Sequence, residues 1–215
     1  YAQSPYSFPT IGSTICIHKE TYKAIYGFSD RMAGEDFYLL NKAAKIAPIY
    51  YLDRGTLRLR DRDSIRVPFG TGPAVRAIIN NGNQRPTYHP ELFEQLRGLN
   101  ALLFNEMDEE LLSSLGQYFK EPTLIKRFEN LLRQGCHQSR IIRRRFELFD
   151  AFRTMRLLHH WRDQVQPVEI RDAIHSYAFL PSPPAKLEEW CEWIEEIERE
   201  RLVGKAYGLT KLEDR

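Results

Sequence analysis

Residues 34–42 read Gly-Glu-Asp-Phe-Tyr-Leu-Leu-Asn-Lys, so two acids stand directly between a glycine and an amphipathic segment. Apolar side chains recur on one face of residues 35–46, which predicts a helix. Glu35 and Asp36 then fall in its first turn, where backbone N–H groups lack partners and the helix dipole favours negative charge. Such a carboxylate can act as a general base for a hydroxyl, although helix capping alone also explains acids at this position.

The sequence around this stretch, up to residue 81, has the pattern of a mixed α/β fold. Its segments are short and rich in Gly, Pro, Tyr and β-branched residues. The predicted elements are strands at residues 13–18, 49–52 and 56–60 and helices at residues 19–26 and 35–46.

From residue 88 onward the pattern is almost wholly helical, with apolar residues at helical spacing. The predicted helices begin at Pro90 and Pro122 and cover residues 139–161, 167–181 and 185–202. We expect the residues after Gly204 to fray. The predicted class is therefore α+β, with a partial α/β segment over residues 1–81 followed by an all-helical domain over residues 88–215.

The composition excludes several classes of protein. A net charge of +2 in 215 residues gives no strong attraction to nucleic acid. No apolar run approaches the roughly 20 residues that span a bilayer, so we expect no transmembrane segment. The three cysteines are widely spaced, which argues against a disulfide framework and predicts a reducing, cytoplasmic location.

Two further clusters could bind a polar ligand. Gly12, Ser13 and Thr14 enter a predicted strand and offer backbone N–H groups and hydroxyls that suit sugar hydroxyls or phosphate, although an ordinary tight turn has the same composition. The second cluster covers residues 61–74, where a loop runs into a predicted helix N-terminus and could place arginines on a diphosphate. A surface loop with internal Arg–Asp pairs is the alternative.

Together and in this order, the clusters resemble the C-terminal half of a family 2 glycosyltransferase domain of the GT-A type, most closely a bacterial branch. The resemblance covers residues 4–79, about a third of the chain. The matching features are Gly12-Ser13-Thr14, the segment from Tyr22 to Phe28, the turn Gly34-Glu35-Asp36 with its helix, and the loop from Arg62 to Gly72.

The resemblance implies a role for each of these residues. Asp36 corresponds to the general base for the acceptor hydroxyl, and Glu35 assists it. Arg62 and Arg66 correspond to a loop that closes over the donor diphosphate, with Thr71 and Gly72 in the same substrate-binding loop. The implied partners are a nucleotide-sugar donor and a hydroxyl acceptor.

The features of the family that the sequence lacks are equally informative. The nucleotide-binding half, which ends in a metal-binding Asp-x-Asp motif, precedes the acid pair in the family. Asp61-Arg62-Asp63 has the spelling of that motif but follows the acid pair, so we assign it no metal. We therefore expect a fragment of a transferase that is inactive alone, with Mn²⁺ or Mg²⁺ needed in the full-length enzyme and none bound by this fragment.

Two other interpretations remain open at this point. The chain could be a helical interaction or regulatory module attached to a transferase remnant. It could also bind RNA or DNA through a basic cluster at Arg140, Arg143, Arg144 and Arg145. A solvated helix face paired with nearby acids is the commoner role for such a cluster, so we expect no nucleic-acid partner.

Overall fold

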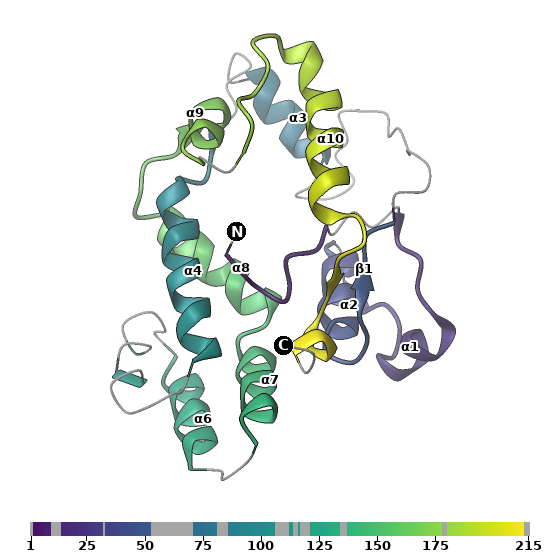
Figure 1. Ribbon diagram of the computed structural model, residues 1–215, viewed down its shortest axis with the longest axis vertical. Coiled ribbons are helices and arrows are strands. Elements are labelled where there is room, and N and C mark those ends of the chain that lie inside the picture. Colours follow the sequence, from purple (N-terminus) through teal and green to yellow (C-terminus); the bar gives the residue numbers. More distant parts are fainter. Residues whose placement is uncertain are drawn as a thin grey trace.

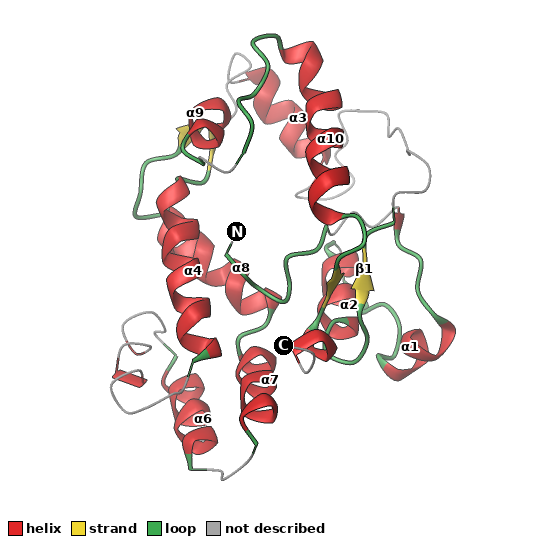
Figure 2. Ribbon diagram, viewed as in Figure 1, coloured by secondary structure: helices red, strands yellow, loops and turns green. Residues whose placement is uncertain are grey.

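The structure is a computed structural model that describes residues 2–9, 14–31, 33–52, 71–80, 86–105, 112–113, 116, 121–133, 137–177 and 180–212. Helices dominate these residues, and the strands form small two-stranded sheets (Figure 2). The described residues thus agree with the coarse α+β or mainly-α class.

The described α-helices are 6 to 15 residues long. Their bounds are α1 Lys19–Ala24, α2 Glu35–Ala43, α3 Thr71–Asn80, α4 Pro90–Phe104, α6 Pro122–Leu132, α7 Gln138–Leu148, α8 Ala151–Arg162, α9 Ile170–His175 and α10 Trp190–Leu202, with 3₁₀ turns η2 Leu187–Glu189 and η3 Leu209–Leu212.

Each sheet joins segments that are far apart in the sequence. Strand β1 (Ile49–Tyr50) pairs antiparallel with β4 (Ala206–Tyr207), and β2 (Pro86–Thr87) pairs antiparallel with β3 (Val168–Glu169). The β1–β4 pair brings the C-terminal segment back to the N-terminal part of the chain (Figure 1).

One hydrophobic core extends across both predicted parts of the chain. Tyr6, Phe8 and Leu40 belong to the same cluster of buried residues as Phe146 and Leu209. In Figure 1, α4, α6, α7 and α8 lie to the left of α1, α2 and β1, and both groups contribute residues to this core. The predicted division between residues 81 and 88 stays a prediction, but burial does not separate the two parts.

The helices with clear local start signals were predicted correctly. α4 and α6 begin at Pro90 and Pro122, because proline suits the first turn of a helix. The predicted helices at residues 19–26 and 35–46 form as α1 and α2, each ending a few residues early, and the strand at residues 49–52 forms as β1. The strand predicted at residues 56–60 lies outside the described residues.

Several predictions were wrong. Residues 15–18 form no strand, and Thr14 lies in a short 3₁₀ segment. The expected long helix over residues 139–161 is two helices, α7 and α8, because Asp150 caps a new helix start. Residues 167–181 contain β3 and the short helix α9, and the last helix begins at Trp190, later than predicted.

The C-terminal residues do not fray up to Leu212. Backbone N–H groups of Gly208 and Leu209 donate to Pro5 O and Ala44 O at 2.9 and 2.7 Å. Leu209 is fully buried against the core. The region from residue 88 is therefore mainly helical, as expected, but it also contributes β3 and β4.

Candidate functional site

The acid pair occupies the first turn of α2, as the sequence predicts. Gly34 caps this helix with φ +73°, a left-handed conformation that glycine adopts at little cost. Glu35 is exposed, whereas Asp36 is half-buried. The Phe37 N–H donates to Asp36 Oδ1 at 2.8 Å, which satisfies one of the unpaired donors at the helix start and fixes the carboxylate.

Aromatic side chains and an arginine surround this turn. The Arg31 guanidinium lies 3.8 Å from the centre of the Tyr38 ring, a cation–π contact. The Tyr38 ring also packs against Phe37 on α2 and Phe152 on α8, with ring centres 5.5 and 5.7 Å apart. A positive charge therefore lies beside the start of α2.

The structure describes only part of the other predicted binding residues. Thr14 is exposed, and Thr71 and Gly72 form the start of α3, with Gly72 buried. The predicted helix is thus present, but it begins inside the Gly-Thr-Gly sequence, so Thr71 and Gly72 belong to the helix and not to the loop before it. Gly12, Ser13, Arg62 and Arg66 lie outside the described residues.

A cavity of about 600 Å³ lies against the residue that follows Asp36. Phe37 forms part of its wall, together with the N-terminal segment 2–8, α4, α8 and the segment after α9. Its volume falls in the range of small-molecule sites. Asp36 itself does not line the cavity but is adjacent in sequence to a residue that does.

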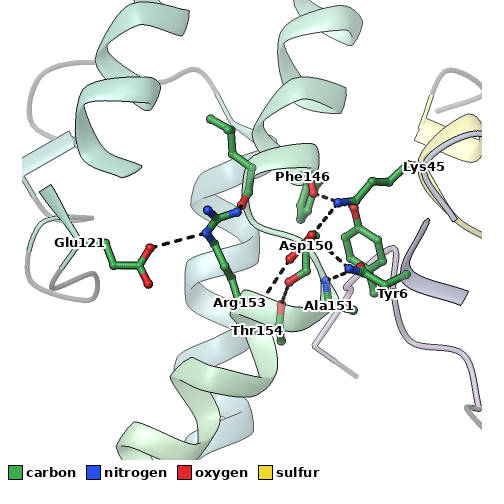
Figure 3. Close-up of polar contacts among 10 residues, drawn as sticks. Tyr6, Lys45, Glu121, Phe146, Asp150, Ala151, Arg153 and Thr154 are labelled. Carbon is green, nitrogen blue, oxygen red and sulfur yellow. Dashed lines mark hydrogen bonds and ion pairs between the residues drawn. The ribbon is translucent and has the colours of Figure 1, made fainter. Parts of the chain in front are cut away.

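A buried polar cluster fixes α2 against α8 (Figure 3). Asp150 Oδ2 accepts from Lys45 Nζ at 2.5 Å and from Asn41 Nδ2 at 3.1 Å, and its Oδ1 accepts from Arg153 N at 3.2 Å. Asn41 in turn accepts from Ala151 N at 3.1 Å. These bonds hold the C-terminal half of α2 on the first turn of α8.

The charge state of this cluster follows from its contacts. Burial alone would raise the pKa of Asp150, but the hydrogen bond and charge of Lys45, with hydrogen bonds from Asn41 and Arg153, hold that pKa below its ordinary value. Burial, with the nearby charges of Asp150 and Glu147, raises the pKa of Tyr6 well above its ordinary value. Tyr6 therefore stays protonated and donates to Phe146 O at 2.7 Å.

Most of the basic cluster on α7 has structural partners. Arg145 is buried and donates to the Leu103 carbonyl at 3.1 Å and to the Asn105 carbonyl, at the C-terminus of α4. Arg143 donates to Lys45 O at 3.0 Å and to Glu147 at 3.3 Å. These contacts favour the structural role over nucleic-acid binding, because cations stabilise the carbonyls at helix ends.

The described residues offer no site for the metal that the resemblance implies. Within them, no three side chains of His, Cys, Asp or Glu come together as metal ligands. No step below depends on a divalent ion. A separate finding is that none of the described helices combines the length and hydrophobicity needed to cross a bilayer.

Sequence reasoning missed both the cavity and the polar cluster. The cavity is built from segments that only tertiary structure brings together, so no local pattern could reveal it. Asp150 did carry a signal, because an Asp before an Ala-Phe-Arg segment is a good helix N-cap.

Comparison of the chain with known protein families, with curated proteins and with solved structures found no match.

Proposed function

We propose that the chain is the acceptor-side part of an inverting, family 2-like glycosyltransferase in which Asp36 is the general base. The observation that supports this most strongly is the position of Asp36. It is half-buried in the first turn of α2, behind a left-handed glycine and next to a residue that lines a ligand-sized cavity. A plain helix cap requires no such neighbour.

The proposed reaction moves one proton and one sugar. The acceptor hydroxyl gives its proton to Asp36 as its oxygen attacks the anomeric carbon of the donor. The bond from that carbon to the nucleoside diphosphate breaks on the opposite face, so the anomeric configuration inverts.

The geometry of Asp36 suits this task. Because Oδ1 accepts the Phe37 N–H, the second carboxylate oxygen is the one left to receive a proton. Exposed Glu35 adds negative charge beside it without burial. Arg62 and Arg66 would stabilise the leaving diphosphate in this proposal, which follows from the resemblance alone.

The decisive test uses the full-length protein with a panel of nucleotide sugars, and the release of nucleoside diphosphate is measured. We expect Asp36→Asn to lower turnover by about 10²- to 10⁴-fold while donor binding is retained. Glu35→Gln is the matched control, with a much smaller expected loss.

Near-normal turnover in Asp36→Asn would reject the general-base assignment. If the full-length protein neither binds nor turns over any nucleotide sugar, that result would favour the alternative that the chain is a helical interaction or regulatory module.

A further inference from the structure

We propose that the cavity beside α2 binds a hydrocarbon chain, and that the acceptor is an alcohol or glycoside carrying such a chain. The identity of the ligand as the acceptor rests on the proposed function. The apolar character of the site rests on the cavity alone.

The wall of the cavity is mainly carbon. Aromatic and aliphatic side chains from separate elements face it, and none of the described residues that line it is charged. The side chains that define this surface are Phe37, Phe93, Leu96, Met155, Leu158 and Leu180. An ionic ligand would lose hydration there without gaining an oppositely charged partner among these residues, whereas a hydrocarbon chain has no favourable hydration to lose.

The hydroxyl groups in the wall are already engaged in part. Tyr6 donates its hydroxyl proton to Phe146 O at 2.7 Å, and Thr154 donates to Asp150 O at 3.0 Å. Ser4 Oγ accepts from the Tyr6 N–H at 3.2 Å. Those bonds fix the N-terminal segment and α8, and they use the hydroxyl protons of Tyr6 and Thr154.

The position of the cavity connects it with the proposed base. Phe37 both lines the cavity and donates its N–H to Asp36. Adjacent α-carbons are about 3.8 Å apart. Consecutive side chains on a helix point in different directions, so the proposal requires the head group of a ligand whose chain lies against Phe37 to extend out of the cavity to the Asp36 carboxylate, which would take its hydroxyl proton.

Binding is tested first, with the full-length protein and β-glucosides bearing hexyl to decyl chains, each below its micelle concentration. Burial of each added methylene should lower Kd about fourfold until the cavity is full. Calorimetry measures Kd directly. A Kd that does not change with chain length would overturn the proposal.

Variants locate the binding site. Met155→Trp places a bulky ring on the half-buried, cavity-facing side of α8, and we expect it to weaken decyl glucoside binding at least tenfold. His160→Trp puts the same ring on an exposed position of the same helix and should leave binding unchanged. Leu180→Trp fills the cavity from another segment, so misfolding of one variant does not decide the result. Unchanged binding in a folded cavity variant would contradict the assignment.

Transfer is tested separately, with glucose and decyl glucoside as acceptors. We expect decyl glucoside to have the lower KM, and we expect Asp36→Asn to bind it normally while failing to glycosylate it. Chain-dependent binding with active Asp36→Asn would reject the base but keep the cavity site. Turnover of glucose and decyl glucoside with equal KM would reject the cavity's role but keep the transferase.

Discussion

Asp150 connects two helices that the sequence does not place together. One carboxylate oxygen caps α8 through the Arg153 N–H, and the other accepts from Lys45 and from Asn41 on α2. The side chains of Asp150 and Lys45 are only 11% and 29% exposed, so solvent screens this pair weakly. α2, which positions Asp36, is therefore held partly by one carboxylate.

The lowered pKa of Asp150 makes this contact sensitive to pH. The native state binds the proton less readily than the unfolded state, so the contact stabilises fully above the ordinary value of 3.8 and is lost as pH falls through the lower native pKa. We expect Asp150→Asn to lower the free energy of unfolding by about 2 kcal/mol at pH 7. Urea titrations at pH 7 and pH 3 measure the difference in free energy of unfolding between the unchanged protein and the variant. We expect this difference to be smaller at pH 3, and an equal difference at both pH values would contradict the assignment.

Arg145 is the cationic counterpart of Asp150, because it is a buried side chain that donates hydrogen bonds to backbone carbonyls. Replacing it with Met keeps a similar volume but leaves the Leu103 and Asn105 carbonyls at the end of α4 without this donor. We expect a loss of about 2 kcal/mol of stability. Exposed Arg140→Met is the control and should change stability by less than about 0.5 kcal/mol. Equal effects of the two changes would mean that the cluster acts through its net charge.

Helix starts show how far the sequence could predict the elements. Pro90 and Pro122 mark α4 and α6 by local chemistry, and both helices were predicted. The break between α7 and α8 was missed because Phe146, Phe149, Phe152 and Met155 recur at a spacing of three, which suggests a continuous helix. The chain instead starts a new helix at Asp150, whose carboxylate accepts the Arg153 N–H, a donor that has no intrahelical partner at a helix start.

The candidate site likewise has one part that the sequence predicts and one that it does not. The placement of Glu35 and Asp36 was predictable, because a helix N-terminus is a local feature. The cavity beside Phe37 was not, because its wall depends on the packing of the N-terminal segment against α4 and α8.

Gly208 determines how the C-terminal segment meets α2. Its φ is +106°, and a Cβ at this position would lie 2.9 Å from Ala44 O, the acceptor of the Leu209 N–H. We expect Gly208→Ala to cost about 2–3 kcal/mol, since it combines backbone strain with loss of this contact. Gly204→Ala is the control: its φ is +77°, but the space around it is open, so about 1 kcal/mol is expected. Thermal unfolding of both variants measures the difference, and equal losses would show that the close approach to Ala44 does not matter.

The whole molecule is held together by contacts that are distant in sequence. The residues after Gly204 were expected to fray, as terminal segments often do. This segment is instead ordered by its pairing with β1 and by burial of Leu209 and Leu212 in the common core. Such pairing depends on the partner strand more than on local propensity, which is why the sequence did not reveal it.

This shared core leads to a prediction about residues 88–215 made alone. The core of that fragment would lack Tyr6, Phe8 and Leu40, and strand β4 would lack its partner strand β1. We expect it to keep helical far-UV circular dichroism but to lose near-UV signals and cooperative unfolding in urea, because its helices remain while specific packing does not. Residues 1–215 serve as the reference. A fragment that unfolds cooperatively, with a urea m-value in proportion to its size, would instead show that the predicted boundary separates two independent domains.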